Sequence, residues 1–375
     1  MADLNTLPVQ PAARQPRGAV KIAGTTTLGW LSWEVENNVF RAADTFRVTF
    51  AASLLPAARD LAWFTKQTEI VLEIFATDAP ADPANYAPTA ADRIIYGQVD
   101  DIDYHPVSGT LELTGRDLTA RLIDTRISAN NSNQTSSEVA TQIAGKHGLK
   151  PVVTATSAKI GTYYSADHVD VSQQQSEWEM LAKLADYEGF DVFVKGDELH
   201  FGPKPAEGTD HYALVWTPPT ADAAHPTLNA VNLTLSRSLT IAKGVTVEVR
   251  SWNAKQKKAF TASWPKSVKP VRPGASSNEN QTYRFSVPGL TQDQATARAQ
   301  KLYAQIVQHM VKLAADMPGD AILDCTKTIA LRGTATGFDQ VYFPDSVRRS
   351  MSMDEGYRMS VTAKNISEDI AAAAS

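Results

Sequence analysis

Residues 173–203 read QQQSEWEMLAKLADYEGFDVFVKGDELHFGP and carry the clearest structural signal of the chain. The negative charge of Glu177 suits the N-terminus of a helix, and Gly189 suits its end. Between them, one apolar face is formed by Trp178, Leu181 and Ala185. Apolar residues then alternate on both sides of a Lys-Gly-Asp-Glu turn at 195–198. The stretch therefore predicts a helix followed by a β-hairpin.

A second helix is predicted upstream of this stretch. Thr135-Ser136-Ser137-Glu138 has the spacing of a capping box, and Gly148 suits the end of the helix that it begins. The two helices and the hairpin together predict a small α+β module over residues 126–205.

Strand patterns precede this module. β-branched and aromatic residues alternate with polar ones over residues 30–36, 45–51, 69–77, 93–104 and 110–114. The turn-forming residues 105–109 join the last two segments as a hairpin. We expect an antiparallel sheet here.

Strand patterns also follow the module, after a proline-rich connection over residues 203–226. The predicted strands cover residues 228–235, 245–252, 258–264, 321–331, 346–353 and 357–364. The longest helical pattern runs from 291 to 315, where the apolar stripe comprises Ala295, Ala299, Leu302, Ile306, His309 and Leu313. The fold class is therefore mainly β with an α+β insert.

The chain of 375 residues is too long for a single core, because cores stop growing at roughly 250 to 300 residues. We expect a flexible N-terminal arm at 1–19 that orders only against a partner, and a tail at 371–375. Between them we expect a first β-rich domain at 20–125, the module at 126–205, and a second β-rich domain with one long helix at 206–370.

Composition excludes several classes of protein. The 36 Lys and Arg residues against 41 Asp and Glu residues give a net charge of -5, so a general affinity for nucleic acid is not indicated. The single cysteine, Cys325, cannot form an intramolecular disulfide or a cysteine-based zinc site. No segment has the ~20 apolar residues of a membrane span, which predicts a soluble protein without membrane insertion, made in a cytoplasm.

No catalytic motif is present in the sequence. Neither HExxH nor GxSxG occurs, and no two of the seven histidines have the i, i+4 spacing of a metal pair on a helix. Cys325 lies within a predicted strand, where burial blunts reactivity. We predict no catalytic, cofactor-binding or metal-binding residues and no enzymatic activity.

The best cluster of carboxylates is Asp100, Asp101 and Asp103 with Glu112 on the facing strand. Paired carboxylates can perform acid/base hydrolysis when their pKa values differ. Most of these acids share a face opposite apolar neighbours, which is typical of a solvated sheet face. The sequence therefore favours a water-facing acidic wall over an active site.

Two tryptophans stand close together on the first strand of this region. Trp30 and Trp33 are three residues apart, so alternation places them on opposite faces of the strand. One of them would then belong to the core, and the other would meet a neighbour or form part of an assembly interface.

Residues 115–203 resemble the phage late control protein D family, the hub proteins of phage tail baseplates. The most specific match is Ser176–Ala185, SEWEMLAKLA, with the glutamine-rich lead before it and the hairpin ending in Phe-Gly-Pro after it. Residues 43–48 and 343–364 resemble the family's first-barrel strand and terminal strands. The family is similar to the N-terminal part of type VI secretion spike proteins.

The resemblance implies two β-barrel domains of tail-tube type flanking the module, and a homotrimer that forms a pseudo-sixfold ring. Such a ring joins the tail tube to a spike or tip protein, lies in the virion baseplate, and lets DNA pass without specific binding. A tape measure protein is a further implied partner, and no cofactor is implied. Asp100, Asp101, Asp103 and Glu112 would then face the lumen, where carboxylates repel DNA phosphates.

Three alternatives stay open at this point. The chain could be the hub of a type VI secretion system or of another phage-tail-like injection machine. It could be a tail enzyme that degrades cell wall, which would need paired acids or a metal site in an extra domain. The module could instead bind peptidoglycan, since a small helix-and-hairpin unit can resemble a lysin motif.

Overall fold

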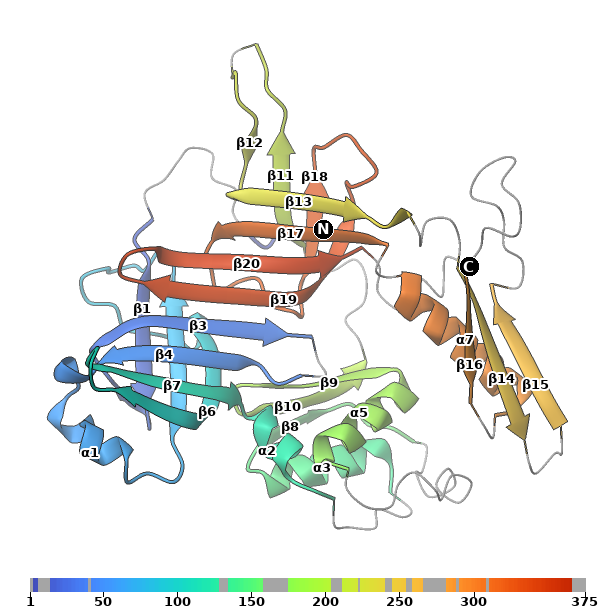
Figure 1. Ribbon diagram of the computed structural model, residues 1–375, viewed down its shortest axis with the longest axis horizontal. Coiled ribbons are helices and arrows are strands. Elements are labelled where there is room, and N and C mark those ends of the chain that lie inside the picture. Colours follow the sequence, from blue (N-terminus) through green and yellow to red (C-terminus); the bar gives the residue numbers. More distant parts are fainter. Residues whose placement is uncertain are drawn as a thin grey trace.

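The computed structural model describes residues 3–5, 14–39, 42–127, 134–157, 175–203, 211–221, 223–239, 245–253, 258–265, 281–287, 290–307 and 310–365. Most of the ordered elements are strands, and helices are few. The predicted fold class, mainly β with a small α+β module, is confirmed (Figure 1).

The strands of the first half are β1 Arg17–Ile22, β2 Thr25–Thr26, β3 Trp30–Asn38, β4 Thr45–Ala51, β5 Val71–Thr77, β6 Arg93–His105, β7 Thr110–Asp117, β8 Lys150–Val153, β9 Phe190–Lys195 and β10 Glu198–Pro203. Those of the second half are β11 His211–Thr217, β12 Thr227–Leu228, β13 Asn232–Arg237, β14 Val245–Asn253, β15 Lys258–Trp264, β16 Gln281–Ser286, β17 Val311–Pro318, β18 Thr328–Arg332, β19 Val341–Ser352 and β20 Gly356–Lys364. The α-helices are α1 Leu61–Phe64, α2 Thr119–Asp124, α3 Ser136–Lys146, α5 Glu177–Glu188 and α7 Gln292–Val307.

One continuous run of eight antiparallel strands forms the body of the molecule, in the order β6-β7-β4-β3-β19-β20-β17-β13. Figure 1 shows most of these strands stacked one above the other. The first four belong to one lobe, which β5 and β1 extend, and the last four belong to a second lobe, which β18 and β11 extend. The two predicted barrels are thus two lobes of one fourteen-stranded sheet, joined where β3 pairs with β19.

Each lobe encloses its own apolar core. Burial alternates along the strands, so that Trp33 and Val35 of β3 lie inside while Glu34 and Glu36 do not. The first core includes Val48, Phe50, Leu72, Ile74, Leu111 and Leu113, and the second includes Leu214, Leu313, Ile329, Tyr342, Val347 and Val361.

The α+β module is a third unit with a separate core. Helix α3 begins with the capping box that the sequence predicts at Thr135, α5 begins with a second capping box at Ser176, and Gly189 ends α5 in the left-handed conformation. These helices pack on the three-stranded sheet β8-β10-β9, with Trp178, Leu181, Leu199 and Phe201 in the core. Leu122 of α2 also belongs to this core, so the unit begins upstream of residue 126.

A fourth unit is inserted between β13 and β17. It consists of the sheet β15-β14-β16 and the helix α7, which share their own small core (Figure 1). The predicted stripe holds for Ala295, Ala299, Leu302 and Ile306, which pack in this core.

The prediction of one helix from 291 to 315 is wrong from Val311 onward. Residues 311–318 form β17, in which burial alternates strictly and Leu313 lies in the core of the second lobe. The apolar residues of this segment fit a helical stripe, but they also alternate with a period of two, which is the pattern of a strand. His309 lies outside the described residues.

Two further predictions in the second lobe need correction. The proline-rich connection at 203–226 contains β11, which pairs in parallel with β18. The strand expected over 321–331 begins only at Thr328, because the Asp320 carboxylate accepts hydrogen bonds from the backbone N–H groups of Ile322 and Leu323 and forms a turn there. Cys325 therefore lies in a loop and not in a strand.

The N-terminal segment makes contacts within the chain. The Leu4 N–H donates to the His211 carbonyl over 2.8 Å, and the Asn5 side chain exchanges two hydrogen bonds with the backbone of Ala213. Residues 17–19, expected in the arm, begin β1. The rest of the expected arm up to residue 13, and the tail at 371–375, lie outside the described residues.

Gly115 allows β6, β7 and the core to approach closely. A Cβ atom added there would lie 2.1 Å from the Gln98 carbonyl oxygen and 2.6 Å from the Phe46 ring, whereas one added at Gly145 of α3 would meet nothing within 4 Å. We expect Gly115→Ala to lower the free energy of unfolding by roughly 1–3 kcal/mol through overpacking. Gly145→Ala should instead raise it by up to about 1 kcal/mol. Urea denaturation measures both, and an equal response of the two variants would contradict the described packing.

Candidate functional site

One face of the eight-stranded run is polar from end to end. The strand registers and the burial pattern place on it Asp101, Asp103, Glu112, Thr114, Arg116, Thr45, Arg47, Glu34, Glu36, Arg348, Ser350, Arg358, Ser360, Thr362, Lys312, Asp316, Asn232, Thr234 and Ser236. The opposite face holds the two cores. We call the first surface the polar face.

The structure brings the four predicted acids together on this face. Asp103 of β6 lies directly opposite Glu112 of β7, and Asp101 is the next outward residue of β6. Asp100 is the extra residue of a β-bulge between Val99 and Asp101, and its side chain joins the same surface.

Only some of these acids are neutralised by nearby arginines. Asp100 binds Arg116 through two hydrogen bonds of 2.6 and 3.0 Å, and Arg116 also contacts Asp124 at 2.9 Å. Glu112 forms a longer ion pair with Arg47, at 3.5 Å. Within the part of the chain that the structure describes, Asp101 and Asp103 have no ion pair.

The charge of the polar face changes from one lobe to the other. Carboxylates predominate on β6 and β3, whereas β19 and β20 present Arg348, Arg358 and Lys364 between serines and threonines. The ion pair between Arg348 and Glu34, with a distance of 2.6 Å, lies where the lobes join. An acidic wall is therefore a property of the first lobe.

The expected orientation of the two tryptophans is wrong. A bulge between Trp30 and Ser32 interrupts the alternation, so Trp30 lies opposite the buried Phe50 and both indoles point toward the core. Trp33 is 2% exposed and packs against Tyr357, with ring centroids 5.7 Å apart. Trp30 is half-buried against the same core. Neither side chain lies on the polar face.

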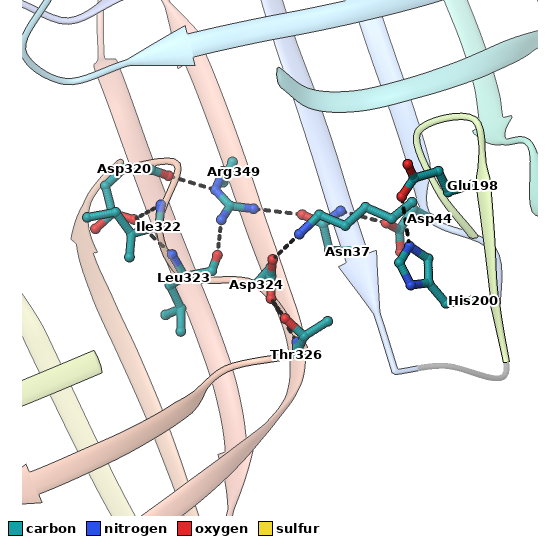
Figure 2. A network of polar contacts seen from close by, with 11 residues as sticks. Asn37, Asp44, Glu198, His200, Asp320, Ile322, Leu323, Asp324, Thr326 and Arg349 are labelled. Carbon is teal, nitrogen blue, oxygen red and sulfur yellow. Dashed lines mark hydrogen bonds and ion pairs between the residues drawn. The ribbon is translucent and has the colours of Figure 1, made fainter. Parts of the chain in front are cut away.

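A buried arginine joins the two lobes beneath this face. Arg349 of β19 is 2% exposed, and its guanidinium donates to the carbonyl oxygens of Asp320 and Leu323 in the second lobe (Figure 2). It also donates to the Asn37 side chain of β3, over 2.6 Å, and Asn37 donates in turn to Asp44. A single side chain thus connects β19, β3 and the loop that precedes β18.

The module is attached at the same point. Lys195, at the tip of the hairpin between β9 and β10, forms an ion pair of 2.9 Å with Asp324 of the second lobe. Burial alone would raise the pKa of Asp324, but the charge of Lys195 and hydrogen bonds from Thr326 hold that pKa below its ordinary value.

Asp44 and Asp117 form the acidic side of this junction. Burial raises the pKa of Asp44 to about 6, although hydrogen bonds from Asn38 and Asn37 oppose the shift. Burial and the charge of Asp44 raise the pKa of Asp117 well above its ordinary value. The pair therefore holds protons more tightly than free carboxylates do.

A cavity of about 270 Å³ lies at the junction and is lined by all three units: Asn37, Asp44 and Tyr96 from the first lobe, Trp178 and Lys195 from the module, and Asp324, Cys325 and Arg349 from the second lobe. Burial raises the pKa of Cys325, so its thiol is a poor nucleophile here. Across the described ranges, no group of three or more His, Cys, Asp or Glu side chains is arranged to hold a metal ion. In the same ranges no helix combines the length and the apolarity of a membrane span.

Sequence reasoning missed this junction, although one signal for it is present. Ser346-Val347-Arg348-Arg349-Ser350 carries two adjacent arginines in a strand, and alternation must turn one of them toward the core. A buried arginine needs partners for its donors, which points to a polar contact inside the fold. The partners, from Asn37 to Asp320, are too distant in sequence to be inferred.

Solved structures with a similar fold include tail proteins, two of them encoded by prophages. The tail protein from Neisseria meningitidis MC58 matches with a TM-score of 0.67 at 15% identity, over 93% of this chain and 96% of that chain. The 43 kDa tail protein of prophage MuSo2 from Shewanella oneidensis matches with a TM-score of 0.63 at 15% identity, over 94% and 97%. Prophage tail protein gp18 from Listeria monocytogenes EGD-e gives 0.54 at 9% identity, over 93% and 94%.

No model of a protein family and no curated protein matches the chain. The structural matches extend over nearly the whole length of both chains in each comparison. They confirm the predicted resemblance at the level of the fold, which is that of phage tail proteins.

Replacing Arg349 should destabilise the contact between the two lobes. We expect Arg349→Met to lower the free energy of unfolding by about 3–5 kcal/mol, because it leaves the acceptors of Asn37, Asp320 and Leu323 buried and unpaired. The neighbouring Arg348→Met removes only a half-exposed ion pair and should cost about 1 kcal/mol or less. Guanidinium denaturation of both variants provides the measurement, and similar losses would argue against a special role for Arg349.

The acidic pair should make stability depend on pH. Because the folded-state pKa of Asp44 lies above its unfolded value, the folded chain binds more protons between about pH 4 and pH 6. Its contribution is therefore most favourable below pH 4 and is lost as the pH rises through 6. Asp44→Asn should flatten this part of the thermal-stability profile, and a variant profile with the same slope as the wild type would contradict the prediction.

Proposed function

We propose that this chain is a structural protein of a phage tail baseplate, in which three copies form a ring between the tail tube and the central spike or tip. The observation that carries the proposal is the continuous polar face over a sheet to which each lobe contributes four strands. The likeness in fold to phage tail proteins supports it.

The repetition of the lobes supports a ring with approximate sixfold symmetry. Strands β6, β7, β4 and β3 in one lobe correspond in number and pairing direction to β19, β20, β17 and β13 in the other. Three such chains supply six lobes, which match a sixfold tube on one side while keeping threefold symmetry for a spike on the other.

The polar face suits the lining of a channel through which DNA passes. Duplex DNA carries one negative charge per ≈ 1.7 Å of helix axis, so the unpaired carboxylates of Asp101 and Asp103 repel it. The arginines of the face are largely engaged with carboxylates, as Arg116 is with Asp100 and Arg348 with Glu34. Passing DNA would therefore find few free cations to bind.

The junction around Arg349 supports this role mechanically. It fixes the angle between the lobes, and hence the curvature that each chain brings to the ring. The module docks on the same junction through Lys195 and Asp324. The proposal assigns no catalytic step to any residue and places the protein in the virion, in contact with the tail tube, the spike and, inside the channel, the tape measure protein.

Light scattering behind size exclusion, with negative-stain images of the same peak, tests the ring. We expect a mass of three chains and particles with a central hole. A compact monomer at every concentration and in the presence of tube and spike proteins would contradict the proposal.

Charge reversal on the polar face tests the channel. We expect the wild-type ring to leave duplex DNA unretarded in a gel-shift assay at physiological salt. Glu36→Lys with Glu112→Lys should produce binding that disappears as salt is raised. The control Asp293→Lys with Asp354→Lys makes the same change in net charge on α7 and on the turn before β20. Equal DNA binding by the two double variants would contradict a channel lined by the polar face.

A further inference from the structure

The unit inserted between β13 and β17 differs in charge from the rest of the chain. Residues 245–307 hold ten Lys and Arg residues against three Asp and Glu residues, which is a net charge of +7. The remaining 26 basic and 38 acidic residues give the rest of the chain a net charge of -12. Such an asymmetry within one chain is typical of a part that contacts an anionic partner.

The sheet β15-β14-β16 of this unit has one covered and one uncovered face. Val245, Val247, Val249 and Ala262 lie in the core that the sheet shares with α7. Because side chains alternate along a strand, the neighbours of these residues lie on the opposite face. The strand registers place there Glu248, Arg250, Trp252, Ala259, Thr261, Ser263, Thr282, Arg284 and Ser286. All of them except Glu248 are exposed, and we call this surface the outer face.

A tryptophan is exposed on the outer face. All seven tryptophans lie within the described residues, and Trp252 is the most exposed of them, at 57%. The residue directly opposite on β15 is Ala259, and the next outward residue of that strand is Thr261. These small side chains leave the flat face of the indole open to a ligand. A tryptophan in water adds little to the core, whereas exposed Trp and Arg side chains are typical of binding surfaces.

Two arginines give the outer face its positive charge. Arg250 forms a close ion pair with Glu248, and Arg284 reaches the same carboxylate only at 3.8 Å. Two cations therefore share one anion, and the side chain of Arg284 is 66% exposed. A guanidinium binds a carboxylate or phosphate group through two parallel hydrogen bonds. Arg284 lies opposite Glu248, four residues from Trp252 along the strand or about 13 Å, so a ligand that contacts both must be extended.

We propose that the outer face binds an anionic polysaccharide. A sugar ring packs its C–H groups on the indole of Trp252, and an acidic group of the same polymer binds Arg284. The hydroxyl groups of Thr261 and Ser263 lie between these contacts on the neighbouring strand and can form hydrogen bonds with the hydroxyl groups of the sugars. The inference goes beyond the proposed ring and does not depend on it, because the inserted unit has its own core.

The composition of the outer face favours a polysaccharide over a nucleic acid. Proteins that bind single-stranded nucleic acid stack successive bases on several aromatic side chains, and the outer face offers Trp252 as its single aromatic residue among those described. Duplex DNA is held by many contacts to phosphates, whereas the outer face has two arginines and one of them is engaged by Glu248. One aromatic ring among hydroxyl groups and a cation suits a charged sugar.

Titration of the whole protein with three polymers tests the proposal. Polygalacturonate carries both sugar rings and carboxylates, polyglutamate carries carboxylates without sugar rings, and dextran carries sugar rings without charge. We expect polygalacturonate to bind and to shift the tryptophan emission to the blue, since Trp252 leaves water on binding. Polyglutamate and dextran should bind at least about tenfold more weakly, because each lacks one of the two contacts.

Variants with matched controls locate the contact on the outer face. Trp252→Ala should weaken the binding of polygalacturonate on the order of tenfold. Tyr104→Ala removes an aromatic of similar exposure, 47%, from β6 in the first lobe and should leave the affinity unchanged. Arg284→Gln should weaken binding and lower its dependence on salt, whereas Lys66→Gln removes an exposed charge after α1 and should do neither.

Three outcomes would overturn the inference: no binding of polygalacturonate, equal affinities of the wild type and Trp252→Ala, or tighter binding of single-stranded DNA than of polygalacturonate. None of them bears on the ring, which light scattering tests separately. Unfolding midpoints equal to that of the wild type show that each variant is folded.

Discussion

The architecture depends on the hydrogen bonds of one buried guanidinium. Arg349 is enclosed between the lobes, and each of its donors must find an acceptor because unpaired donors are costly in the interior. The acceptors come from β3 and from the loop before β18, so they fix the position of one lobe against the other. The same constraint holds β3 and β19 in register, and that register makes two four-stranded sheets into one continuous surface.

With the two lobes joined at this junction, the two faces of the sheet have different roles. The inner face supplies the two apolar cores, and the outer face is free to be polar along its whole width. The module and the inserted unit have their own cores, so neither relies on the polar face for stability. Charge on that face can therefore be arranged for function, and the two carboxylates that lie opposite one another on β6 and β7 are consistent with that freedom.

Local signals in the sequence predicted local structure well. The capping boxes at Thr135 and Ser176 specify their helices through side chains within three residues, and the alternation in β4 and β15 fixes those strands residue for residue. The fold class follows from these elements. The position of Asp101, Asp103 and Glu112 on the polar face follows from the period of two of a solvated strand face, whereas Asp100 reaches that surface only through a bulge.

The sequence-based predictions failed where the structure depends on residues far apart in the chain or on a single inserted residue. A bulge at the start of β3 turns Trp30 to the same side as Trp33, and the alternation in the sequence gives no sign of this bulge. The segment after Val307 fits a helical stripe and a strand equally well in sequence, and only its pairing with β13 and β20 makes it the strand β17.

The pairing of β3 with β19 also bears on the order of folding. More than 300 residues separate Trp33 from its partner Met351, so during synthesis the first lobe must wait for nearly the whole chain before its sheet is completed. Contacts of such high sequence separation form slowly, so the sheet that unites the two lobes is completed late in folding.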